Sequence, residues 1–113
     1  MANTFKLKTK NMIGTGSESV YKVPAATTTV MIGCSLANRS TNAVQASVFV
    51  SSSTSDTETN QPIYVVKDAP IATGGALEVM SGNKFVLQTA DVVKVNSDAS
   101  GSVDAALSIM EIS

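Results

Sequence analysis

The stretch Thr28-Thr-Val-Met-Ile-Gly-Cys-Ser-Leu-Ala37 is followed by Asn38-Arg-Ser-Thr-Asn42 and then by Ala43-Val-Gln-Ala-Ser-Val-Phe-Val-Ser51. Apolar side chains recur at every second position of the first and third parts, as in strands whose successive side chains point to opposite faces. The small polar residues between them favour a turn. The stretch therefore predicts a β-hairpin over residues 28–51, with two long strands at the centre of a sheet. The predicted core faces are Val30, Ile32, Cys34 and Leu36 in the first strand, and Val44, Ala46, Val48 and Val50 in the second.

Short alternating segments and turn residues continue along the rest of the chain, and no helical period is sustained. The last segment, 103–112, has Val103, Ala105, Leu107 and Ile109 on one face, which indicates a central strand that closes the domain. The pattern predicts an all-β fold, an antiparallel β-sandwich or jelly roll of about eight to nine strands. An up-and-down barrel is the competing arrangement, and periodicity does not separate it from a sandwich.

The length of 113 residues corresponds to one domain. We expect residues 18–113 to form a single β-sandwich domain and residues 1–17 to form an N-terminal arm or edge strand. In this arm Phe5 and Leu7 alternate with Lys6, Lys8 and Lys10. The alternation predicts a half-buried strand with its apolar side inward and its lysines outward. The lysines then either protect a sheet edge from pairing or dock on an acidic neighbour.

The net charge of −1 and the 15 % of charged residues give little attraction to nucleic acid or to an anionic membrane, so neither is expected as a partner. The chain has no long apolar run that could span a membrane, and its first residues lack the apolar region of a signal peptide. We therefore expect it to be made in the cytoplasm. The single cysteine, Cys34, excludes an intrachain disulfide and is expected to be a buried, inert thiol, with an intermolecular disulfide as the alternative.

The chain contains no histidine, the commonest general base and a frequent metal ligand. We expect no catalytic residues, no metal site and no cofactor. The polar stretch 51–60 is expected to be a solvated loop or a hairpin tip, and Thr54, Asp56 and Glu58 within it are candidate partner contacts, together with the three lysines. Asn38-Arg-Ser40 matches a glycosylation sequon, but we interpret it as a turn.

Short segments with a characteristic content and order are spread over residues 18–113. They are Val20-Tyr-Lys-Val-Pro24, Thr27-Thr-Thr-Val30, Ser35-Leu-Ala-Asn38, Ile63-Tyr-Val-Val-Lys-Asp-Ala-Pro-Ile71, Leu77-Glu-Val79 with Gly82-Asn-Lys84, Asp91-Val-Val-Lys-Val95 and Ser108-Ile-Met-Glu-Ile-Ser113. In these segments the chain resembles small virion structural proteins of tailed bacteriophages, especially those that infect cyanobacteria and other marine bacteria. Residues 1–17 lie outside the resemblance.

The resemblance implies a non-enzymatic component of the virion. Its first expectation is a decoration or cement protein that binds the outer capsid surface and stabilises the shell. The partners would be the major capsid protein or other virion proteins, and the chain would be present as a homo-oligomer or in multiple copies. The alternative is a neck, tail or fibre-associated component, with a receptor-binding or glycan-binding role.

Overall fold

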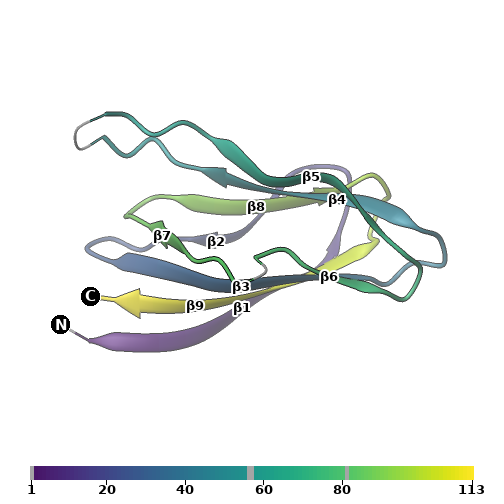
Figure 1. Ribbon diagram of the computed structural model, residues 1–113, viewed down its shortest axis with the longest axis horizontal. Helices are drawn as coiled ribbons and strands as arrows, with labels where there is room; N and C mark the ends of the chain where they lie inside the picture. Colours follow the sequence, from purple (N-terminus) through teal and green to yellow (C-terminus); the bar gives the residue numbers. More distant parts are fainter. Residues whose placement is uncertain (1, 56–57, 81) are drawn as a thin grey trace.

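Two antiparallel sheets pack face to face in a computed structural model, which describes residues 2–55, 58–80 and 82–113 (Figure 1). The described part of the chain contains strands and no helix. The strands are β1 (Asn3–Ile13), β2 (Glu18–Lys22), β3 (Thr28–Asn38), β4 (Val44–Ser51), β5 (Ile63–Ile71), β6 (Ala76–Glu78), β7 (Phe85–Leu87), β8 (Val92–Ser97) and β9 (Val103–Ile112).

The order of the strands is that of a jelly roll. The larger sheet has the order β1-β9-β3-β6, with β7 also paired to β3, and the smaller sheet has the order β2-β8-β4-β5. The pairs β1 with β9, β2 with β8, β3 with β6 and β7, and β4 with β5 are nested, as in one long hairpin rolled over on itself. The tip of this hairpin is the connection between β4 and β5. The prediction of an all-β sandwich or jelly roll is therefore confirmed.

The predicted hairpin over residues 28–51 is wrong, because β3 and β4 lie in different sheets. β3 pairs with β9, β6 and β7, whereas β4 pairs with β5 and β8. Residues 39–43 cross from one sheet to the other. Alternation shows only that each strand has one buried face, and two strands that face a common core from opposite sheets meet this condition as well as two neighbours do. Both strands are nevertheless central in their sheets, as predicted.

The core face of β3 changes along the strand. Met31 is fully buried and Val30 is not, while beyond Gly33 the buried side chains are Cys34 and Leu36. The pairing with β9 shifts between Met31 and Gly33, which marks an extra residue in one strand. Such a bulge reverses the alternation, so the predicted core face is correct for the second half of β3 and wrong for the first.

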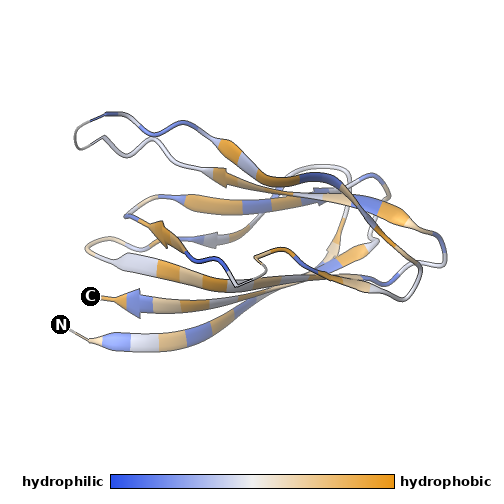
Figure 2. Cartoon of the chain, in the orientation of Figure 1, coloured by the Kyte–Doolittle hydropathy of each residue, from blue (hydrophilic) through white to orange (hydrophobic). Residues whose placement is uncertain are grey.

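The core between the sheets is built mainly from aliphatic side chains. The predicted inward faces of β4 and β9 are buried, and so is the Cys34 thiol. Figure 2 shows hydrophobic residues recurring along the central strands of both sheets. The largest fully buried side chains include Ile13, Met31, Leu36, Met80, Leu107 and Ile109.

A buried asparagine holds the connection between the sheets. The Nδ2 of Asn38 donates hydrogen bonds to the main-chain oxygens of Asn42 (2.8 Å), Ile71 (3.1 Å) and Ala72 (3.3 Å). The Oδ1 of Asn38 accepts hydrogen bonds from the main-chain N–H of Ser40 (2.9 Å) and from the hydroxyl of Ser40 (2.8 Å). Asn38 therefore supplies the partners that the main chain loses where it leaves the larger sheet.

Candidate interaction surface

The first strand has the opposite orientation to the one predicted. Phe5 and Leu7 point to solvent, with 74 % and 64 % of their surfaces exposed. Lys6 lies opposite Ile109 and Lys8 opposite Leu107, both of which are core residues of β9. Residues that lie opposite one another in a sheet share a face. The lysines are therefore on the inner side of the sheet edge, and the two apolar side chains are on its outer face.

A buried carboxylate explains this orientation. Glu111 of β9 lies on the inner side, with its Oε1 2.8 Å from the Nζ of Lys6. The hydroxyl of Tyr21 donates to Oε2 of Glu111 (2.5 Å) and forms a hydrogen bond of 2.8 Å with Oγ1 of Thr29. A buried charge is costly unless it is paired. An inward-facing lysine supplies the partner, and a phenylalanine or leucine at this position would leave the carboxylate without it.

The pKa values follow from these contacts. The hydrogen bonds from Lys6 and Tyr21 hold the pKa of Glu111 below its ordinary value. Burial, and then the hydrogen bond to Glu111, raise the pKa of the Tyr21 hydroxyl to about 12. Glu111 is thus a charged anchor between the edge strand and the core.

We expect the anchor to make stability depend on pH. Because the pKa of Glu111 is lower in the folded than in the unfolded state, its contribution is present above the unfolded-state pKa and is lost as the pH falls through the folded-state pKa. The free energy of unfolding should fall between pH 7 and pH 3, and it should fall less for Glu111→Gln than for the wild type. Urea unfolding of both proteins at the two pH values measures the difference. Equal losses in the two proteins would contradict the assignment of Glu111 as a charged anchor.

The other residues predicted to contact a partner lie apart from one another. The Nζ of Lys10 is 3.7 Å from Oε1 of Glu18. Lys8 is half-buried. Oγ1 of Thr54 donates to Oδ1 of Asp91 (3.1 Å), which ties the base of the hairpin tip to the body. Glu58 is exposed near the tip, and Asp56 lies outside the described residues. Figure 1 shows the β4–β5 tip and β1 on opposite sides of the molecule, so these residues do not form one site.

An apolar row crosses the outer face of the larger sheet, with exposed side chains at its two ends and half-buried ones between them. Phe5 of β1 lies opposite Met110 of β9, Met110 opposite Val30 of β3, and Val30 opposite Val86 of β7. Val86 is 66 % exposed. We call these four residues the apolar row. Single exposed apolar residues are ordinary, but a contiguous row across four strands is typical of an interaction surface.

The outer face of the smaller sheet differs, because lysines lie beside its aromatic rings, although Tyr64 is still 54 % exposed. The rings of Phe49 and Tyr64 lie 5.6 Å apart. The Nζ of Lys94 is 6.0 Å from the centre of the Phe49 ring, and the Nζ of Lys67 is 5.4 Å from that of Tyr64. These distances allow cation–π attraction. The apolar row has no such cover among the described residues, so it is the stronger candidate contact surface.

A shallow hollow of about 300 Å³ lies on the same outer face, toward the other end of the strands. Across it Thr9 lies opposite Ala106, and Ala106 lies opposite Ser35. We call these three residues the small-residue row. The hollow is lined by Thr9, Lys10, Asn11, Ser35, Ala37, Asp104, Ala105 and Ala106.

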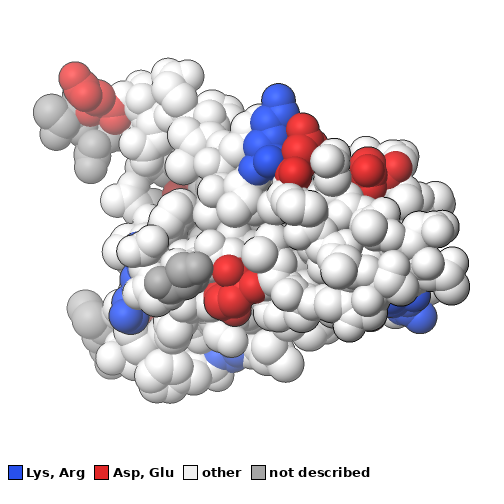
Figure 3. Space-filling model, turned by 45° about the vertical axis from the view of Figure 1, so that its right-hand side comes forward, with Lys and Arg blue, Asp and Glu red and all other residues white. Residues whose placement is uncertain are grey.

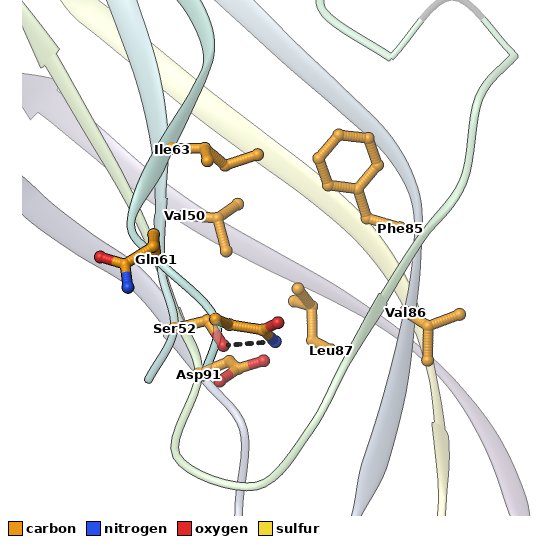
Figure 4. Close-up of a pocket in the computed structure, with 9 residues that line it drawn as sticks. Val50, Ser52, Gln61, Ile63, Phe85, Val86, Leu87 and Asp91 are labelled. Atoms are coloured by element: carbon orange, nitrogen blue, oxygen red, sulfur yellow. Dashed lines mark hydrogen bonds between the residues drawn. The ribbon is translucent and has the colours of Figure 1, made fainter. Parts of the chain in front are cut away.

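A second pocket, of about 320 Å³, opens between the base of the hairpin tip and β7 (Figure 4). Its apolar walls include Val50, Ile63 and Leu87. Three of its polar residues have partners: Ser52 accepts a hydrogen bond from Asn60 (3.3 Å), marked in Figure 4, and Asp91 accepts one from Thr54 (3.1 Å). The pocket suits an apolar side chain better than a charged ligand. No group of residues that could hold a metal ion is present in the described part of the chain.

The sequence reasoning missed the apolar row because its members are far apart in the chain. The only signal was the strict alternation in the arm, which places Phe5 and Leu7 on one face but does not say which face is buried. Identification of the row requires the register of four strands. In the space-filling view of Figure 3, charged side chains form a few separate groups on a largely uncharged surface.

Comparisons with known proteins support the fold. No protein-family model and no curated protein sequence matches the chain. Among solved structures, T=1 particles derived from infectious bursal disease virus match 97 % of this chain, with a TM-score of 0.58 and 12 % identity. The VP2 subviral particle of that virus matches 96 %, with a TM-score of 0.54 and 12 % identity. This chain covers only 31 % and 32 % of those chains.

A pilus protein has a similar fold over nearly its whole length. The disulfide-linked pili of Bacillus endospore appendages match 99 % of this chain and 87 % of their own, with a TM-score of 0.55 and 13 % identity. At such identities the likeness establishes the β-sandwich fold and not an activity. No helix that could cross a membrane occurs in the residues described.

Proposed function

We propose that the chain is a non-enzymatic structural component of a tailed-phage virion, a decoration or cement protein on the outside of the capsid. The proposal is supported by the resemblance of residues 18–113 to phage virion proteins and by a fold that virus particles also use. The observation that carries it is the uncovered apolar row on the outer face of the larger sheet. This face is the surface through which the chain would join its neighbours in the particle.

The mechanism is added contact area. Full burial of an exposed valine, leucine or phenylalanine contributes about 1.5–3 kcal/mol before the costs of association. Phe5, Leu7 and Val86 are each about two-thirds exposed or more, so most of this contribution is available. A protein that binds the assembled shell and not its free subunits shifts assembly by mass action. Many copies, each weakly held, would stabilise the joints of the shell.

The hairpin tip and the lysines remain proposed contacts with the major capsid protein. Lys6 and Lys10 already form ion pairs within the chain, with Glu111 and Glu18. To dock on an acidic neighbour, they would have to exchange these partners. We therefore place the contact with a neighbouring subunit of the particle on the apolar row, and the contact with the major capsid protein at the tip, around Thr54 and Glu58.

A neck, tail or fibre-associated component is the second candidate. It is favoured by the likeness to a pilus protein, since that match covers nearly all of both chains. A fold of this kind serves in both settings, and the number of copies on a particle separates them. A decoration protein occurs in step with the capsid subunits, whereas a neck or tail component forms one ring or a few fibres.

The double variant Phe5→Glu, Leu7→Glu tests the contact surface. We expect the number of copies on purified particles to fall by about tenfold or more, because two carboxylates would be buried without partners. Quantitative gels or mass spectrometry of particles made with each protein measure the change. The circular dichroism spectrum should stay that of the wild type, since both positions are exposed in the single chain.

The matched control is Ser19→Glu, which adds a carboxylate to an exposed position on β2 of the smaller sheet. It should leave the number of copies unchanged. Normal occupancy by the double variant would contradict the role of the outer face. Loss of both the double variant and the Ser19→Glu control from the particle would indicate a general effect of negative charge, and this result would also contradict the role of the outer face.

A further inference from the structure

We infer that the partner of this outer face is a second copy of the same chain, related to the first by a two-fold axis that lies in the interface and runs across the strands. The inference rests on the proposed function in that it names the partner of the same surface. It is carried by the relation between the apolar row and the small-residue row.

The two rows are equally spaced about a third one. Along β9, Met110 and Ala106 each lie two residues from Ser108, and along β1, Phe5 and Thr9 each lie two residues from Leu7. Two residues of a strand span about 6.6 Å. Leu7 and Ser108 lie opposite each other and so form a middle row, which continues to Gly33 of β3.

A two-fold axis along this middle row therefore brings the apolar row of one copy opposite the small-residue row of the other. It places β1 over β1 and β9 over β9, running in opposite directions, with the apolar row of each copy above the small-residue row of the other. Phe5 would then face Thr9 of the other copy, and Met110 would face Ala106. The large side chains of each copy would thus lie over the hollow of about 300 Å³ in the other copy, and this contact occurs twice, once on each side of the axis. An isologous contact has this self-complementarity.

The distribution of charge agrees with such an interface. Among the described residues, the apolar, middle and small-residue rows contain no charged side chain on β1, β9 and β3. Glu78 of β6 borders them at the rim, opposite Ser35, and its Oε1 accepts a hydrogen bond from the main-chain N–H of Cys34 (3.1 Å). At the rim, Oδ1 of Asp104 is 3.1 Å from Nη1 of Arg39. An uncharged centre with a charged rim is the usual composition of protein interfaces.

The face is also large enough. β9 has 10 residues, and so it spans about 33 Å, while four strands about 4.8 Å apart cover about 19 Å. The flat area is thus about 600 Å², and the side chains increase it toward the roughly 800 Å² that each partner buries in a standard interface. The face is thus close in size to one side of a standard interface.

Contact between faces is favoured over pairing between edges. β1 is an edge strand, and it carries Lys6, Lys8 and Lys10 on its inner side. Inward-pointing charged residues protect edges against added strands, and two such edges would bring six lysines together. The outer face of β1 has no such protection.

Crosslinking through the two-fold axis tests the inference. Leu7 lies on the proposed axis, so the variant Leu7→Cys places two thiols opposite each other in a dimer. The native Cys34 is buried, and burial raises the pKa of its thiol to about 12, so it should not react. With a short bis-maleimide, we expect Leu7→Cys to give a covalent dimer and the control Ser19→Cys, on the smaller sheet, to stay monomeric.

Sedimentation provides a second measurement. The wild type should sediment as a dimer at micromolar concentration, and Ala106→Arg, which fills the hollow, should raise the dissociation constant tenfold or more while the circular dichroism spectrum stays that of the wild type. A wild type that stays monomeric at these concentrations, or equal crosslinking of the two cysteine variants, would overturn the inference.

The two proposals fail in different ways. If the purified chain is monomeric but the Phe5, Leu7 double variant is still lost from particles, the second copy is wrong and the contact surface stands. If the chain forms the dimer but is absent from virions, the dimer stands and the proposed function is wrong.

Discussion

Replacement of Asn38 by alanine lowers the free energy of unfolding by about 3 kcal/mol or more, because several buried polar groups lose their partners at once. The side chain of Asn38 accepts from Ser40 and donates to the main-chain oxygens of Asn42, Ile71 and Ala72. Asn38 is itself buried, so water does not readily replace these bonds. Urea unfolding followed by circular dichroism measures the loss.

The matched control is Asn42→Ala in the same connection. It keeps the main-chain oxygen that accepts from Asn38, and its own side chain is exposed, so the change should be within about 0.5 kcal/mol. Equal effects of the two substitutions would show that the crossing between the sheets does not depend on Asn38.

Replacement of Leu107 by alanine should cost about 2–5 kcal/mol, the usual range for removal of a buried leucine side chain. Leu107 is 1 % exposed and lies near the middle of β9, between β1 and β3. The loss combines the apolar surface returned to water with the cavity left between the sheets. Chemical denaturation again provides the measurement.

Met110→Ala is the control on the same strand. Met110 lies on the outer face and is only half-buried, so we expect a loss below about 1 kcal/mol. The same variant should weaken the dimer, because Met110 belongs to the apolar row. A large loss of stability from Met110→Ala, or none from Leu107→Ala, would contradict the division of β9 into a folding face and a contact face.

Local pattern was sufficient for the fold class and for many of the core faces. Alternation placed the buried side chains of β4 and β9 correctly, because these strands have one apolar face toward the core and regular alternation along most of their length. It did not pair the strands correctly. The jelly roll separates β3 from β4 in space although they are neighbours in sequence, and the partners of β3 come from residues 76–112. Such long-range pairing leaves no mark in the periodicity of a single strand.

The orientation of β1 required a tertiary contact. A pattern of alternating lysine and apolar residues fits a sheet in either direction, and hydrophobicity alone favours Phe5 and Leu7 inward. The charge of Glu111 decides otherwise, since it recruits Lys6 to the inner side. Likewise, the bulge between Met31 and Gly33 reverses half of the predicted face of β3. The candidate surface follows from these two features, so the sequence alone did not reveal it.

A density map of the intact particle is the most direct test of the central claim, that the chain joins its neighbours on the capsid through the outer face of the larger sheet. We predict copies on the outside of the shell, in step with the capsid subunits, with Phe5 and Val86 buried in a contact. Copies confined to the neck or tail, or copies on the shell whose Phe5 and Val86 all face solvent, would contradict the claim.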